Sequence, residues 1–177
     1  MKLLDLFKET LSSFFKNEKE NILSDVSERS LCSRLAHYLE ILLSKYELQN
    51  YYADNEYNRK QEGQVKTILN DKETVVTISC DVIVHSRGEN IEQDNLIAIE
   101  MKKSTRPQSE KDSDRNRLRA LTKDSYDGVW SYDGKTYPEH VCGYILGFYM
   151  EIEQASRKCF FETYIKGEKR NEWVKHF

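Results

Sequence analysis

The sequence contains few of the residues that break or cross-link a folded chain. It has only two prolines, Pro107 and Pro138, and it shows no internal repeat, low-complexity tract or linker-like segment. A chain of 177 residues with 38% hydrophobic content therefore suits one globular domain with a small helical extension.

Cysteines are also few, and their spacing excludes two kinds of small protein. No two of the four make a CxxC pair, so neither a zinc finger nor a disulfide framework is indicated. Each lies in an apolar or helical context, which predicts buried thiols and a reducing, cytoplasmic compartment. They are Cys32, Cys80, Cys142 and Cys159.

Long apolar runs are missing as well. No stretch approaches the roughly 20 apolar residues that a membrane-spanning helix needs, so no membrane partner is expected. The N-terminal run does not fit the pattern expected of a signal peptide, because Asp5, Lys8 and Glu9 interrupt it. Its apolar residues recur at helical spacing. We therefore expect an amphipathic helix or partner-binding arm within residues 1–24, followed by the main domain at 25–177.

The charge is nearly balanced overall but uneven along the chain. A formal net charge of −3 argues against a general nucleic-acid coat protein. Residues 102–123, in contrast, carry eight Lys or Arg against three Asp or Glu, a local excess of +5. A basic segment on an acidic protein indicates a defined anionic ligand.

The periodicity of the chain predicts an α/β fold with a mixed sheet flanked by helices. Apolar spacing predicts a helix from about Val26 to Lys45. Asp25 is its expected N-cap, and Glu28, three residues later, completes a capping box. A further helix is expected over 111–123. Strands are expected over 51–59, 74–85, 95–102, 141–152 and 159–165.

Three charged residues interrupt the two most apolar strands. Asp81 lies within SCDVIVH, and Glu100 and Lys102 lie within LIAIEMKK. Charges inside central strands are costly unless they are paired or bind metal. Side chains alternate along a strand, so Glu100 and Lys102 share one face. If the two strands pair through the 86–94 turn, Asp81 lies beside Glu100.

Two carboxylates placed side by side favour a cation between them, and hard oxygen ligands favour Mg²⁺ or Mn²⁺ over zinc. The main-chain carbonyl of Met101 can add another oxygen. Such a site can hydrolyse phosphodiesters, with Lys102 orienting water or stabilising the developing charge. Glu28 can serve as a third carboxylate or bind a second metal.

At these residues the sequence resembles the PD-(D/E)XK nuclease superfamily. The family motif places an acidic residue on one hairpin strand and (D/E)-x-K on the next, matched here by Asp81 and by Glu100-Met101-Lys102. Glu28 matches a glutamate on the preceding helix, whereas Cys80 replaces the proline of the motif. The resemblance implies a restriction-endonuclease-like three-layer core of order αβββαβ. It also implies Mg²⁺-dependent cleavage of DNA, or less often of RNA.

Several residues have two open interpretations. Glu100 and Lys102 can mark a strand end that enters solvent, and Glu28 can be only a helix cap. His85 can contact phosphate or simply end its strand. One face of the first strand can line the cleft or be the solvated face of an edge strand; it carries Asp54, Glu56 and Asn58. Loop aromatics can stack on unpaired bases or pack the loop; they are Trp130, Tyr132 and Tyr137.

Basic residues around this motif are the candidate nucleic-acid contacts. Phosphate contacts position nucleic acid without reading its sequence, and an ordinary charged helix is the competing interpretation. The candidates are Lys103, Arg106, Lys111, Arg115, Arg117 and Arg34. Two rival functions remain: an inactive nuclease-fold binding module, and an interaction protein that forms an oligomer such as a homodimer.

Overall fold

The computed structural model describes residues 2–57, 67–69, 75–77, 80–123 and 142–177. Three helices and a short 3₁₀ helix are present among them: α1 (Lys2–Leu23), α2 (Glu28–Leu43), η1 (Ser44–Tyr46) and α3 (Gln108–Leu121). The strands are β1 (Tyr52–Tyr57), β2 (Thr67–Leu69), β3 (Val75–Thr77), β4 (Cys80–His85), β5 (Asn95–Lys103), β6 (Leu146–Glu153), β7 (Lys158–Ile165) and β8 (Glu168–His176).

Six strands form one mixed sheet in the order β1-β4-β5-β6-β7-β8. Neighbouring strands are antiparallel except β5 and β6, which are parallel and are connected through α3. Parallel neighbours need such a crossover because the chain must return to the same end of the sheet. The predicted α/β class with a mixed sheet is therefore confirmed.

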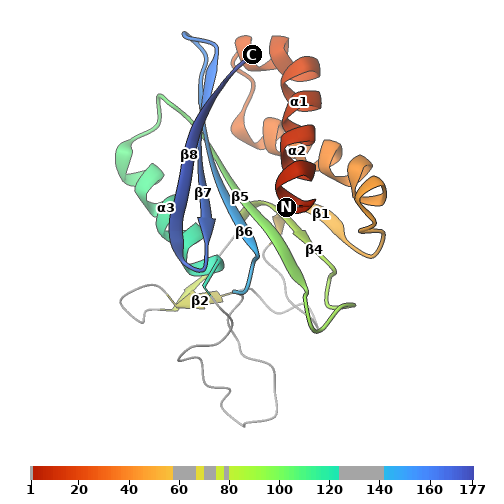
Figure 1. The fold of residues 1–177 in the computed structure, drawn as a ribbon. Coiled ribbons are helices and arrows are strands. Elements are labelled where there is room, and N and C mark those ends of the chain that lie inside the picture. The colour runs from red at the N-terminus through yellow and green to blue at the C-terminus, as the bar shows by residue number, and fades with distance from the viewer. Residues whose placement is uncertain (1, 58–66, 70–74, 78–79, 124–141) are drawn as a thin grey trace.

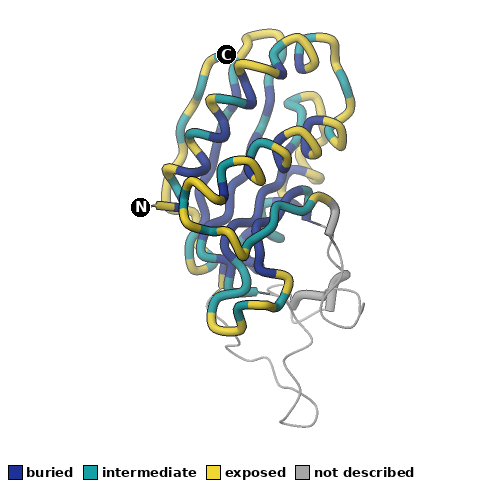
Figure 2. The backbone as a smooth tube through the Cα atoms, turned by 90° about the vertical axis from the view of Figure 1, so that its right-hand side faces the viewer, coloured by how far each residue is buried: buried dark blue, intermediate teal, exposed yellow. Residues whose placement is uncertain are grey.

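Helices cover both faces of this sheet, with α1 and α2 on one side and α3 on the other (Figure 1). Figure 2 shows the buried residues running along the strands and along the inner sides of the helices. Strand alternation divides the core accordingly: Val82 and Ile99 belong to the large cluster under α1 and α2, whereas Ile83 and Ala98 belong to a smaller cluster under α3.

The apolar stripe of α1 is buried against the sheet, as expected of an amphipathic helix. Phe7 is fully buried and stacks on Phe148 of β6, with 3.8 Å between the ring centroids. Phe15 stacks in the same way on Phe177, at 4.9 Å. Among the described residues, no helix has the length and apolarity required to cross a membrane.

The start of α2 corrects the predicted cap. Ser27 is the N-cap, and its hydroxyl accepts a hydrogen bond from the Ser30 N–H. Asp25 lies two residues earlier with φ of 61°, and Glu28 is the first helical residue. The capping box fails because it needs its glutamate at the third helical position, and Glu28 is free to make other contacts.

Strand predictions were correct for the central hairpin and wrong in three places. The 86–94 turn connects antiparallel β4 and β5, and β5 is buried along its middle, as predicted. The stretch 74–85 contains two strands, because β3 pairs with β2 in a separate sheet. The strand expected at 141–152 begins at Leu146, and β8 was not predicted.

Candidate active site

The hairpin of β4 and β5 brings two predicted site residues together. Val82 pairs with Ile99, so Asp81 and Glu100 come next along the two strands and share the face covered by α3. Here a side chain takes part in the hydrogen bonding between the two strands: the Met101 N–H donates to Asp81 Oδ2 at 2.8 Å. The predicted proximity of the two carboxylates is therefore found.

Glu100 is fully buried, so it does not mark a strand end that enters solvent. Its Oε1 accepts a hydrogen bond from Arg117 Nη1 at 2.7 Å, whereas its Oε2 has no hydrogen-bond partner among the described residues. Burial, followed by the charge of Asp81, raises the pKa of Glu100 well above its ordinary value. Burial also raises the pKa of Asp81. Ionising both carboxylates is therefore costly, and a nearby cation would lower that cost.

Lys102 lies on the same face and is held by a residue that the sequence had not indicated. Its Nζ lies 2.8 Å from Asp114 Oδ2, and Asp114 is itself buried on α3. Burial disfavours the charged amine, but the hydrogen bond to Asp114 and the charge of Asp81 outweigh it and raise the pKa of Lys102. The lysine is therefore a protonated amine at neutral pH.

Helix α3 completes this cluster with Arg117, whose Nη1 contacts both Glu100 and Asp114, the latter at 3.2 Å. Arg117, Leu118 and Leu121 follow Asp114 by three, four and seven residues, so all four lie on one side of the helix. The two leucines are its buried apolar anchors. That helical stripe is the signal that would have placed Asp114 and Arg117 against the sheet. We name five of these side chains the charged cluster: Asp81, Glu100, Lys102, Asp114 and Arg117. Counted as ionised, its three carboxylates and two cations have a formal charge of −1.

Glu28 stands apart from this cluster. Its Oε1 accepts hydrogen bonds from the Lys103 N–H at 2.9 Å and from Arg106 Nε at 3.1 Å. It thus ties the start of α2 to the end of β5. The Met101 side chain also faces this side, where Cys32 Sγ lies 3.9 Å from its sulfur. Within the described part of the chain, no group of three or more His, Cys, Asp or Glu is placed to hold a metal ion.

The predicted nucleic-acid contacts all have carboxylate partners inside the chain. Lys111 is almost fully buried, and its Nζ lies 2.7 Å from Glu151. Arg34, on α2, lies 2.7 Å from Glu18. The remaining pairs are Lys103–Asp25, Arg106–Glu28, Arg115–Glu162 and Arg117–Glu100. The basic excess of the segment is therefore largely balanced by acids from other elements.

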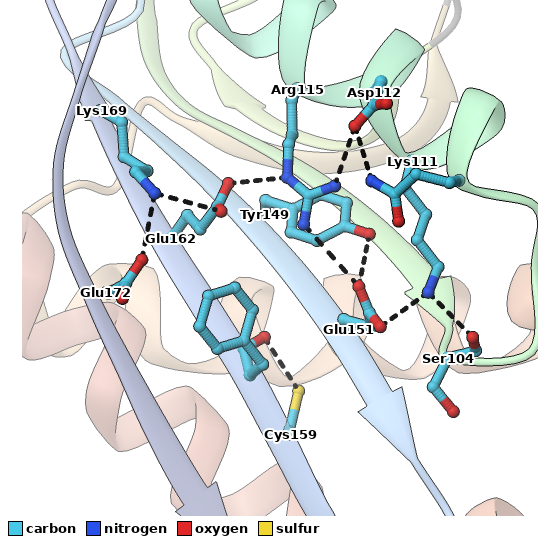
Figure 3. A network of polar contacts seen from close by, with 12 residues as sticks. Ser104, Lys111, Asp112, Arg115, Tyr149, Glu151, Cys159, Glu162, Lys169 and Glu172 are labelled. Carbon is cyan, nitrogen blue, oxygen red and sulfur yellow. Dashed lines mark hydrogen bonds and ion pairs between the residues drawn. The ribbon is translucent and has the colours of Figure 1, made fainter.

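Arg115 illustrates how closely these pairs are built into the fold (Figure 3). Its guanidinium lies 4.1 Å from the centre of the Tyr149 ring and donates from Nε to Glu162 at 3.0 Å. Glu162 also accepts the Tyr164 hydroxyl. Such a residue anchors α3 to β6 and β7, and would have to leave several partners in order to contact phosphate.

His85 is buried, and its Nε2 lies 2.9 Å from Asp54 Oδ2. Arg87 contacts both oxygens of the same carboxylate. Asp54 thus anchors the edge strand β1 to the end of β4. Asn58 and the loop aromatics Trp130, Tyr132 and Tyr137 fall outside the described residues, as does the side chain of Glu56.

Three of the four cysteines belong to the apolar clusters of the core: Cys32, Cys80 and Cys159. All three are buried, as predicted, and Cys142 is half-buried.

Comparisons with protein-family models, curated proteins and solved structures found no match to this chain.

Proposed function

We propose that this chain is a Mg²⁺-dependent nuclease that hydrolyses phosphodiester bonds of nucleic acid, DNA in preference to RNA. The observation that carries the proposal is the convergence of Asp81 and Glu100 on one sheet face, where one buried Glu100 oxygen lacks a partner among the described residues. The chain order also supports a restriction-endonuclease-like core: α2, three antiparallel strands of the main sheet, the crossover helix α3, and parallel β6.

The available ligands suit magnesium. Mg²⁺ is commonly bound by one or two carboxylates together with water and substrate phosphates, and does not need an all-protein cage. Asp81 and Glu100 would supply these carboxylates, and Mn²⁺ could replace Mg²⁺. When bound, the ion would polarise a phosphoryl oxygen and lower the pKa of a bound water.

Lys102 has a defined role in this proposal. Because Asp114 and Asp81 keep its amine protonated, it is suited to stabilise negative charge that develops on the phosphate. A general base would instead need a neutral amine. Asp114 positions the amine, since its carboxylate lies 2.8 Å from Nζ.

A cleavage panel tests this function. Single- and double-stranded DNA and RNA are incubated with Mg²⁺, Mn²⁺ or EDTA, using the wild-type chain and the variants Glu100→Ala and Lys102→Ala. We expect metal-dependent cleavage that falls by about 10²-fold or more in both variants. Glu172→Ala, an exposed acid on β8, is the matched control and should cleave as the wild type does. Cleavage in EDTA, or unchanged cleavage in both site variants, would contradict the proposal.

The ion pairs of the charged cluster favour one alternative, a nuclease-fold module that binds nucleic acid without cutting it. Glu100 and Lys102 already have partners in Arg117 and Asp114. Calorimetry separates the two: the alternative predicts nucleic-acid binding that persists while no divalent cation binds.

A further inference from the structure

Arg117 occupies one oxygen of the carboxylate that the proposed metal would need. Its Nη1 lies 2.7 Å from Glu100 Oε1 and 3.2 Å from Asp114 Oδ1. Its side chain is 25% exposed, whereas that of Glu100 is 0% exposed. The guanidinium therefore enters from the surface of α3 and balances a carboxylate that has no contact with solvent.

We propose that Arg117 is a resident counter-ion of Glu100 and competes with a divalent cation for the Asp81–Glu100 pair. This inference rests on the proposed function, because it takes that pair as the metal ligands. Both cations seek the same carboxylate, and two cations of like charge cannot share it closely without repulsion. Arg117 therefore weakens metal binding.

The second contact of Arg117 makes such an exchange feasible. If the guanidinium leaves Glu100, it still has Asp114, whose carboxylate is almost fully buried and also holds Lys102. One ion pair breaks and the other persists, so no charge is left unpaired in the interior. Arg117 thus partners Glu100 in the metal-free fold and keeps its contact with Asp114 when a cation binds.

The charge count gives the direction of the effect. With all five groups counted as ionised, the charged cluster has a formal charge of −1, and a bound divalent cation brings it to +1. Replacing Arg117 with glutamine makes the cluster −2, and the same cation then brings it to zero. Removing Arg117 should therefore strengthen metal binding, whereas removing an arginine with only a structural role should not.

Isothermal titration with Mn²⁺ alone tests the inference on four full-length proteins: wild type, Arg117→Gln, Arg117→Lys and the control Arg119→Gln. Arg119 lies on the same helix, over the Tyr164 ring and near the Gly167 carbonyl, so its loss removes the same charge outside the cluster. Thermal melting in EDTA and in Mn²⁺ provides a second readout that does not depend on catalysis.

We expect Arg117→Gln to bind Mn²⁺ about tenfold more tightly than the wild type, or better, and to gain more melting temperature from Mn²⁺. Arg117→Lys should lie between the two, because an amine lacks the planar fork that holds two carboxylates. Arg119→Gln should match the wild type. If Arg117→Gln folds only with Mn²⁺, the inference is supported. If it never folds, Arg117→Lys is compared with the wild type, and tighter Mn²⁺ binding by the lysine variant is the expected result.

Equal or weaker binding in the Arg117 variants would overturn the counter-ion role and leave the nuclease proposal standing. If all four folded proteins fail to bind Mn²⁺, both proposals are wrong. Tighter binding in Arg119→Gln as well would reduce the effect to general electrostatics and overturn the assignment to Arg117.

Discussion

The two faces of the six-stranded sheet differ in what they bury. Under α1 and α2 the face is a continuous apolar layer, with Phe7, Phe148 and Phe161 in ring contact. Under α3 the apolar cluster is smaller, and buried charges such as Glu100 and Glu162 lie beside it. Apolar burial stabilises without regard to direction, whereas a buried charge is tolerated only beside a partner. We infer that the first face contributes most of the stability, while the second carries the buried charges on which the proposed chemistry rests.

The largest expected effect comes from breaking the apolar face. Phe7→Ala removes a fully buried ring that stacks on Phe148, and it should lower the free energy of unfolding by about 3–5 kcal/mol. Urea denaturation measures the change. Ile41→Ala, at a residue that is 59% exposed, is the control and should cost under about 0.5 kcal/mol. A similarly small cost for Phe7→Ala would contradict the claim that packing on this face stabilises the fold more than the α3 face does.

An intermediate effect is expected from the pairs on the α3 face. Arg115→Met or Glu162→Gln alone leaves a buried or partly buried charge without its oppositely charged partner, at a cost of about 1–3 kcal/mol. The double variant removes both, so it should cost clearly less than the two single costs combined. A double-mutant cycle by urea denaturation measures the coupling. Costs that add within about 0.5 kcal/mol would show that the pair is not coupled.

The smallest effect depends on pH and concerns the edge of the sheet. Burial opposes the charge of Asp54, but hydrogen bonds from His85 and Arg87 outweigh it and lower the pKa of Asp54 well below its ordinary value. A lowered folded-state pKa gives stability above the unfolded pKa of about 3.8, lost as pH falls toward the folded pKa. Asp54→Asn should therefore cost about 1–2 kcal/mol at pH 7, and this cost should shrink below about pH 4.

Denaturation of both proteins from pH 7 down to pH 3 checks this prediction. A difference in unfolding free energy that stays constant over that range would mean that the Asp54 charge contributes nothing. An increase at low pH would reverse the sign of the argument.

The sequence predicted those parts of the fold in which local pattern and burial agree. β5 is apolar on both parities and is buried on both faces, and the turn after His85 connects it to β4. Asp81 and Glu100 were found because each breaks an apolar run. The helix at 108–121 was placed from only two apolar anchors, and its true start lies three residues earlier than predicted.

The misses have physical causes. β8 reads EKRNEWVKH and is mostly exposed, so no apolar alternation marks it; its pairing with β7 fixes it as a strand. Charges on such an edge protect against pairing with other chains. Asp114 was missed, and Arg117 was assigned to phosphate and not to Glu100, because a helix rich in charge looks solvated. Only the tertiary contact with β5 shows which of its charges are buried.

The parallel pairing of β5 with β6 has a consequence for how this protein is assembled. Antiparallel β4 and β5 can pair through a short local turn. Pairing of β6 with β5 instead requires closure of the long segment that contains α3, which costs more chain entropy. A folding chain that has formed only the hairpin carries Asp81 and Glu100 side by side in water, where solvation shields their repulsion. Docking of α3 then brings Arg117 in the same step that excludes the water. The counter-charge thus arrives together with the desolvation that makes it necessary.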